Sequence, residues 1–82
     1  MITYQTELWQ TAYWRRGDRY YQCELKQNLF ADWVLIRSWG TIGTKRGRQM
    51  ENYCNSFAQA QETFKAVFKR REYRKYQLVS SK

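Results

Sequence analysis

The residues best suited to chemistry in this sequence are a tryptophan and the cations around it. Trp39 is followed by Gly40-Thr41-Ile42-Gly43 and then by the basic turn Lys45–Arg48, and Arg37 lies two positions before it. An indole can stack on a sugar or base while neighbouring cations hold phosphates, and such stacking contributes roughly 1–3 kcal/mol per base. Trp39 could equally cap the hydrophobic core, because large rings are often highly buried. The candidate nucleic-acid-binding residues are Arg37, Trp39, Gly40, Thr41, Lys45, Arg46 and Arg48.

A second group of cations lies towards the end of an expected helix. It comprises Lys65, Lys69, Arg70, Arg71, Arg74 and Lys75. Cations at a helix C-terminus interact favourably with the helix dipole, which accounts for several of them. Six cations exceed what the dipole requires, so phosphate binding is an equal alternative. Lys69, Arg70 and Arg74 are therefore a candidate secondary basic patch.

The charge is unevenly distributed along the chain. The net charge is +8, with five basic and four acidic groups in residues 1–40 and ten basic and three acidic groups in residues 41–82. Such asymmetry indicates a polyanionic partner, most often nucleic acid, because neutralised phosphates release condensed counterions. The alternative is that the cations only keep an aromatic-rich domain soluble.

The sequence lacks the usual equipment for catalysis and for metal binding. It contains no histidine, and no serine lies in a nucleophile-elbow pattern. Cys23 and Cys54 are far apart and have no metal-ligand spacing, so we expect no metal and no cofactor. A disulfide between them is possible, but two buried free thiols are the better interpretation for a cytoplasmic protein. We expect a non-enzymatic, cytoplasmic protein with no small-molecule substrate and no membrane span.

The first half of the chain alternates between apolar and polar residues as strands do. Gly17-Asp18 separates two such stretches and predicts a hairpin turn. The stretch 32–39 is apolar on both faces, which is typical of a central strand. The expected strands cover residues 7–16, 19–27, 32–39 and 48–54.

The period changes to that of a helix at Ser56. Ser56 with Gln59 fits a capping box, and apolar residues then repeat at helical spacing to about residue 74. Residues 76–79 could add a short edge strand, and we expect residues 80–82 to fray. One domain over residues 1–82 is therefore predicted, of α+β class. It has an antiparallel sheet of about four to five strands with one C-terminal helix packed on one face.

These features resemble the WGR domain. The resemblance rests on Trp39-Gly40-Thr41-Ile42-Gly43-Thr44-Lys45, the following strand, and Ser56–Phe68 with Ala60 and Phe64. It covers about residues 18–79 and implies a compact sheet with one packed helix, similar to bacterial domains that occur alone. In DNA-dependent poly(ADP-ribose) polymerases, such a domain grips the end of a broken strand, and the motif tryptophan packs against the terminal nucleotide.

The resemblance also implies roles for individual residues. Trp39 would contact a nucleotide, Gly40 would form the turn that lets the backbone approach closely, and Lys45 would lie near phosphates. Gly43 and Gly47 would shape the turn that follows.

The third motif position departs from the family pattern. It holds Thr41 instead of arginine, and a threonine cannot replace a bidentate, permanently charged guanidinium. Arg37, Arg46 or Arg48 could substitute for it.

Two functions remain open from the sequence. The leading hypothesis is a nucleic-acid-binding module, with DNA the preferred partner, that contacts the backbone or a strand end with little sequence specificity. The alternative is a protein-interaction or regulatory module that uses Tyr4, Trp9 and Tyr13 as anchors.

Overall fold

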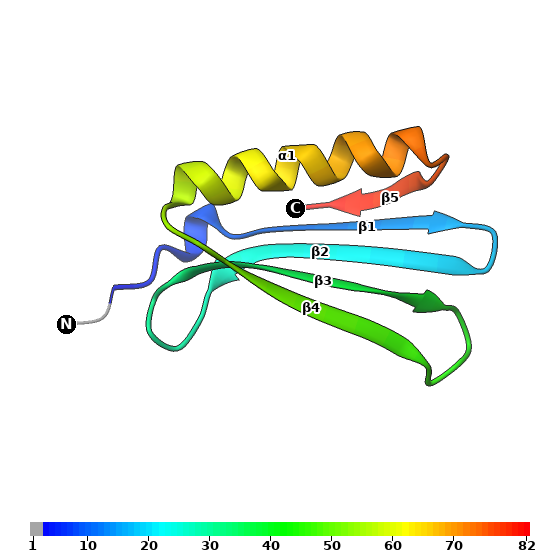
Figure 1. The fold of residues 1–82 in the computed structure, drawn as a ribbon, viewed down its shortest axis with the longest axis horizontal. Helices are drawn as coiled ribbons and strands as arrows, with labels where there is room; N and C mark the ends of the chain where they lie inside the picture. Colours follow the sequence, from blue (N-terminus) through cyan, green and yellow to red (C-terminus); the bar gives the residue numbers. More distant parts are fainter. Residues whose placement is uncertain (1–2) are drawn as a thin grey trace.

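A computed structural model describes residues 3–82 as one antiparallel sheet with a helix packed on one of its faces (Figure 1). The elements in chain order are the 3-10 turn η1 (Thr6–Leu8), the strands β1 (Gln10–Arg16), β2 (Arg19–Gln27), β3 (Trp33–Thr41) and β4 (Gly47–Cys54), the helix α1 (Phe57–Tyr73) and the strand β5 (Gln77–Ser81). The strand order is β4-β3-β2-β1-β5. The predicted α+β class is confirmed, with five strands.

The first strand begins later than the alternation predicted. Residues 6–8 form a 3-10 turn, so β1 starts at Gln10 and not at residue 7. The side chain of Gln27, at the end of β2, explains the difference. Its Oε1 accepts hydrogen bonds from the backbone N–H of Gln5 at 2.7 Å and from Nε1 of Trp9 at 3.2 Å. These bonds hold the N-terminal segment beside β2 and away from the ladder.

The hydrophobic core lies between α1 and the sheet. Ala12, Trp14, Tyr21, Cys23, Leu25 and Leu35 point from the strands to Ala60, Phe64 and Val67 of the helix. Trp14 meets Phe68 edge to face at 4.9 Å between ring centroids, a geometry that stabilises aromatic pairs by about 0.5–1.5 kcal/mol beyond area burial. Val34 and Leu35 are both fully buried, which confirms that this strand is covered on both faces.

Helix α1 starts at the predicted cap. Ser56 Oγ accepts a hydrogen bond from the N–H of Gln59 at 3.1 Å. In return, Gln59 Oε1 accepts a hydrogen bond from the N–H of Asn55, one residue before the cap, at 2.5 Å. The helix ends at Tyr73, and Lys75, with φ of 67°, turns the chain back towards the sheet. No helix in residues 3–82 is both long enough and apolar enough to span a membrane.

The C-terminal residues are part of the sheet. β5 pairs antiparallel with β1, and Lys82 and Thr11 exchange two backbone hydrogen bonds of 2.8 and 2.9 Å. The expectation that residues 80–82 fray is therefore wrong. The unpaired edge of β1 offers backbone donors and acceptors that this segment satisfies.

Candidate nucleic-acid interface

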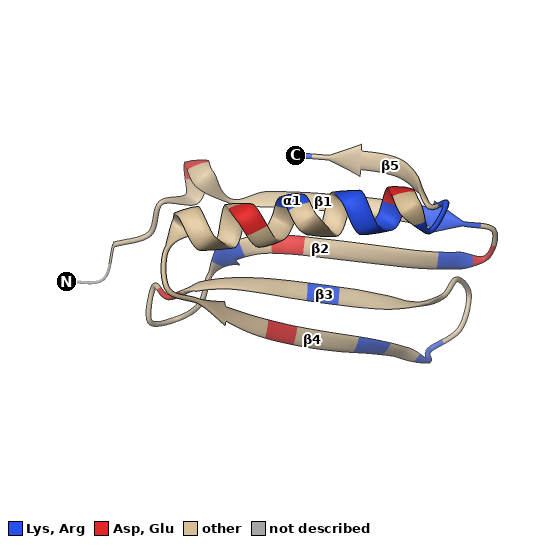
Figure 2. Cartoon of the chain, turned by 45° about the horizontal axis from the view of Figure 1, so that its top comes forward, with Lys and Arg blue, Asp and Glu red and all other residues tan. Residues whose placement is uncertain are grey.

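Cations from three separate segments meet at one end of the molecule. This end holds the β1–β2 turn, the β3–β4 turn and the C-terminus of α1 (Figures 1 and 2). Arg16 Nη1 donates to the carbonyl of Arg74 at 2.9 Å, and Ile42 N–H donates to the carbonyl of Asp18 at 2.7 Å, so the segments are joined. We call this the basic end, defined by the cations of these segments: Arg15, Arg16, Arg19, Lys45, Arg46, Arg48, Arg70, Arg71, Arg74 and Lys75.

A hollow of about 340 Å³ opens at the basic end, on the face of the sheet that carries the helix. Register explains why its strand residues share this face. Tyr21 is paired with Trp39, and Arg37 is paired with Met50, so alternate positions of β2, β3 and β4 point the same way. We call this hollow the arginine pocket, which is lined by Arg19, Tyr21, Arg37, Trp39, Met50, Arg71, Arg74 and Tyr76.

Aromatic rings hold the centre of the arginine pocket. Tyr21 and Trp39 are stacked at 5.9 Å with an angle of 13° between their planes. The guanidinium of Arg71 lies 4.0 Å from the ring centroid of Tyr21 and 4.9 Å from that of Tyr76. Trp39 is half-buried against the core through Tyr21 and also lines the pocket, so it packs on the core and keeps an accessible face.

Among residues 3–82, no carboxylate lies within salt-bridge distance of the arginines of this pocket. Within the described part of the chain, the one pair of opposite charges within salt-bridge distance is Lys26 with Glu24, at 3.8 Å. Arg71 is only 8% exposed, and its Nε has no hydrogen-bond partner among residues 3–82. Burial lowers the pKa of the Arg71 guanidinium because it disfavours the charged form. A buried charge without a counterion costs free energy that a bound anion would offset.

Arg37 is also incompletely satisfied. Its Nη2 donates to Asn52 Oδ1 at 2.9 Å, but its Nε is buried and lacks a partner in the described residues. The Nη2 group of Arg37 is thus bound to β4, and the positive charge of its guanidinium still lines the pocket.

Trp39 and the four predicted cations divide into three groups. Arg37 and Trp39 line the arginine pocket, and Arg48 is paired with Trp39 across β4 and is exposed. Lys45 and Arg46 lie in the exposed β3–β4 turn and do not line the pocket.

Gly40 and Thr41 have structural surroundings. Gly40 lies within β3, so the expectation that it forms the turn is wrong. A Cβ on it would lie 2.8 Å from the carbonyl oxygen of Arg46 and 3.2 Å from the ring of Tyr20, which explains the glycine by packing. The carbonyl of Thr41 accepts hydrogen bonds from the N–H and Oγ1 of Thr44, at 3.3 and 2.9 Å, and so closes the turn.

The three residues of the secondary basic patch do not line one common hollow. Arg74 lines the arginine pocket, whereas Lys69 and Arg70 are exposed, and Lys69 lines a different hollow with Glu72. Arg71 also lines the arginine pocket; the sequence placed it among the six helix cations but not in the smaller secondary patch. The signal was its spacing, because it falls on the same helical stripe as Phe64 and Val67.

Arg19 was also missed as a candidate. It follows the alternation of its strand and lies on the face of Tyr21, which places it in the pocket. Alternation alone could have found it once the inner face of β2 was known.

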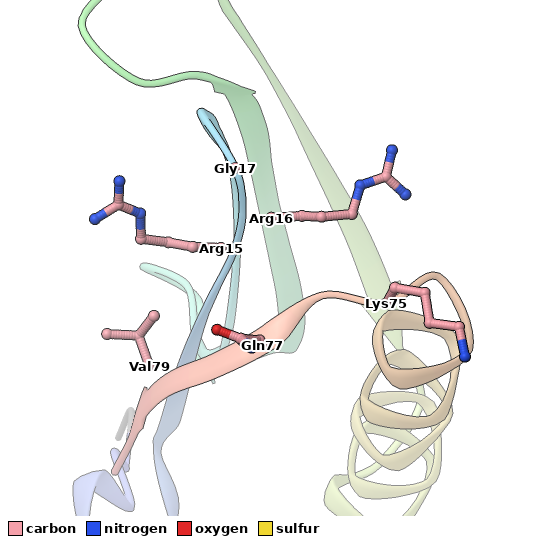
Figure 3. A pocket seen from close by; sticks show the side chains of 6 residues that line it. All are labelled: Arg15, Arg16, Gly17, Lys75, Gln77 and Val79. Atoms are coloured by element: carbon pink, nitrogen blue, oxygen red, sulfur yellow. The ribbon is translucent and has the colours of Figure 1, made fainter.

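A second hollow extends the positive charge round the edge of the sheet. Arg15 and Arg16 project to opposite sides of β1, and Lys75 lies at the end of the helix (Figure 3). The guanidinium carbon of Arg16 also lies 5.5 Å from the ring centroid of Tyr76, a residue of the arginine pocket. The basic end therefore presents cations on both faces of the sheet.

The aromatic residues of the alternative hypothesis do not form one patch. Tyr4 and Trp9 line a hollow near the β2–β3 turn, at the end opposite the basic end, but Tyr13 does not. Tyr13 stacks on Tyr20 at 6.2 Å instead. Beside this hollow, Leu29 and Phe30 are 82% and 76% exposed.

Both cysteines are free thiols. Cys23 is fully buried, and burial raises its pKa to about 12. Cys54 is half-buried at the end of β4, so the expectation of buried thiols is right in full only for Cys23.

Comparison with known proteins identifies the family. The model of the WGR domain matches residues 4–82. An uncharacterized protein, y4dW of Sinorhizobium fredii (strain NBRC 101917 / NGR234), is 36% identical over 62 residues; these make up 76% of this chain and 30% of that protein. The matched residues thus span about a third of the length of that relative. No solved structure matches this chain significantly. The chain belongs to the WGR domain family.

Proposed function

We propose that this chain binds nucleic acid, with DNA as its preferred form, through the basic end and without strong sequence specificity. The observation that carries the proposal is the convergence of ten cations, from three segments, at one end of the molecule. WGR domains are in general nucleic-acid-binding, non-catalytic modules, which agrees with this proposal. Unneutralised guanidinium groups are the groups that phosphates recognise best.

Trp39 gives the proposed interface a nucleotide-contacting surface. Its indole is half-buried and supported by the stacked ring of Tyr21, so it is held in place before a ligand arrives. Arg37 lies on the same face within the pocket, and Arg48 lies opposite Trp39 on β4. In this proposal, a sugar or base stacks on Trp39 while these arginines contact the adjoining phosphates. Lys45 and Arg46 add contacts from the turn.

Low sequence specificity follows from the elements at the basic end. They are two turns and the C-terminal turn of α1, whereas a recognition helix contacts bases in the major groove with its N-terminal residues. Contacts to phosphates position a protein without reading bases. The proposed binding is therefore governed by backbone charge and by strand ends.

Fluorescence anisotropy tests the proposal with blunt, nicked and single-stranded oligonucleotides across a salt series. We expect binding at low salt that weakens steeply as salt rises, because the slope of log affinity against log salt is about −0.9 for each neutralised phosphate of a duplex. Equal affinity for oligonucleotides of unrelated sequence is the second expected result. A folded sample that shows no binding at low salt contradicts the proposal.

A protein partner is a second candidate function, favoured by one observation. Leu29 and Phe30 are exposed side by side at the β2–β3 turn, beside the hollow that Tyr4 and Trp9 line. Large apolar side chains at a loop tip commonly mark contact sites. This surface lies at the end opposite the basic end, so the two functions do not compete for residues.

A further inference from the structure

The most unusual side chain in the molecule is Arg71. It is buried to about nine-tenths, carries a charge that no carboxylate in residues 3–82 neutralises, and has an Nε without a partner. Two aromatic rings offset part of the cost of burying this charge, and no carboxylate of residues 3–82 offsets the rest. The retained guanidinium therefore points to an anion that completes its contacts.

The surroundings of Arg71 fix its orientation. Tyr21 lies against it at 4.0 Å and Tyr76 at 4.9 Å, both measured from the guanidinium carbon to the ring centroid. A guanidinium stacked on a ring keeps its N–H donors in its own plane, where they remain open to a ligand. The two rings thus hold the guanidinium of Arg71 at the wall of the arginine pocket.

Three further guanidinium groups line the same hollow. Arg19 from β2, Arg37 from β3 and Arg74 from the helix C-cap accompany Arg71, and no acidic residue of the described part of the chain lines this pocket. Its volume of about 340 Å³ is large enough for a phosphate with its attached sugar. Thr41, whose position in β3 places it on the same face, offers one short hydroxyl.

We propose that the arginine pocket is a discrete site for one phosphate group, with Arg71 as its principal ligand and Arg19, Arg37 and Arg74 as its neighbours. The sugar that carries the phosphate lies against Trp39. The assignment rests on the proposed function for its macromolecular source, which is nucleic acid. The phosphate can belong to a strand end, to an internal diester or to free phosphate, and the site recognises the chemistry that these three share.

The phosphate site is tested first without nucleic acid. Protein labelled with ¹⁵N is titrated with inorganic phosphate, against sodium chloride at equal ionic strength, while the Nε–Hε signals of the arginines are followed by NMR. We expect a saturable shift of the Arg71 signal and a rise in Tm with phosphate alone. An Arg71 signal that moves equally in phosphate and in chloride overturns the proposal.

Two matched variants separate the site from general charge. Arg71→Met and Arg70→Met remove the same charge from adjacent helix positions, but Arg70 is exposed and does not line the pocket. We expect Arg71→Met to weaken oligonucleotide binding about 10-fold or more, since hydrogen bonds between charged groups are lost, and Arg70→Met to weaken it about 2-fold. Circular dichroism and Tm establish that both variants fold. If Arg71→Met does not fold, Arg71→Lys replaces it in the test. We expect Arg71→Lys to weaken oligonucleotide binding too, because lysine lacks the planar guanidinium with its paired donors.

The outcomes distinguish the two proposals. Binding of nucleic acid that Arg71→Met and Arg70→Met weaken equally overturns the phosphate site and leaves the proposed function standing. A phosphate-dependent Arg71 shift without any oligonucleotide binding overturns the proposed function and leaves the site standing. Oligonucleotides with 5′-phosphate, 3′-phosphate or hydroxyl ends then identify the source. Tighter binding of one phosphorylated end that depends on Arg71 assigns the site to that end, and equal binding assigns it to internal phosphates.

Discussion

At the scale of single residues, the candidate site depends on which side chains lack partners. Trp39 and Arg37 were recognised from the sequence because the Trp-Gly motif drew attention to them. Arg71 was not, because an arginine among helix cations resembles many others. Its burial against Tyr21 and Tyr76 distinguishes it, and burial depends on residues that are distant in the chain.

Replacement of Trp39 by phenylalanine tests the stacking role. Phenylalanine retains a ring that can pack on Tyr21, but it presents a smaller surface to a sugar or base. We expect oligonucleotide affinity to fall several-fold, within the roughly 1–3 kcal/mol that stacking contributes per base. The matched control is Trp33→Phe, because Trp33 packs on Phe57 at 5.0 Å and does not line the arginine pocket. Equal affinity of both variants in an anisotropy titration would remove Trp39 from the interface.

At the scale of elements, the β3–β4 hairpin sets the position of the pocket. Gly40 and Gly47 are paired across the two strands, and both are covered by the side chain of Tyr20 from β2. This close approach fixes β3 and β4 in register, so that Trp39 faces the helix and Arg48 lies opposite it. Gly40 thus allows the close packing of the sheet, and Trp39 beside it lines the arginine pocket.

Gly40→Ala is expected to destabilise the fold. The new Cβ would meet the carbonyl oxygen of Arg46 at 2.8 Å and the ring of Tyr20 at 3.2 Å, and the first of these neighbours is backbone. Overpacking of this kind lowers the free energy of unfolding by about 1–3 kcal/mol. Urea unfolding measures the loss, with Ser38→Ala, two residues earlier on the same face of β3, as the control. Unchanged stability would mean that the hairpin adjusts without cost.

At the scale of the whole molecule, charge is separated along the long axis. The β1–β2 turn, the β3–β4 turn and the end of α1 carry most of the cations, and the opposite end is more acidic (Figure 2). The excess of cations in residues 41–82 predicted part of this separation. It missed Arg15, Arg16 and Arg19, which belong to the first half of the chain but lie at the basic end. Folding concentrates charge that the sequence spreads out.

Two triple variants test whether position or total charge decides binding. The first replaces Lys45, Arg46 and Arg48 with alanine, and the second replaces Lys26, Lys65 and Lys82, so each lowers the net charge from +8 to +5. We expect the first to weaken binding and to flatten the salt dependence, because each lost phosphate contact changes the slope by about 0.9. The second, which lies outside the basic end, is expected to have a much smaller effect. Equal salt slopes would show that only net charge matters.

Local sequence patterns are enough to place most of the secondary-structure elements of this chain. Alternation, the Gly17-Asp18 turn and the Ser56 cap are local signals, and each was found within a few residues of its predicted place. The start of β1 and the pairing of the C-terminal residues were missed because the bonds that decide them come from Gln27 and Thr11, far along the chain.

The arginine pocket was decided by tertiary structure alone. Its four arginines come from β2, β3 and the end of α1, and they meet because strand register and helix packing place them on one face. Whether a cation is paired, exposed or buried depends on neighbours that no local pattern specifies. The Trp-Gly motif therefore indicated the family and the position of Trp39, while folding decided that Arg71 lies beside it.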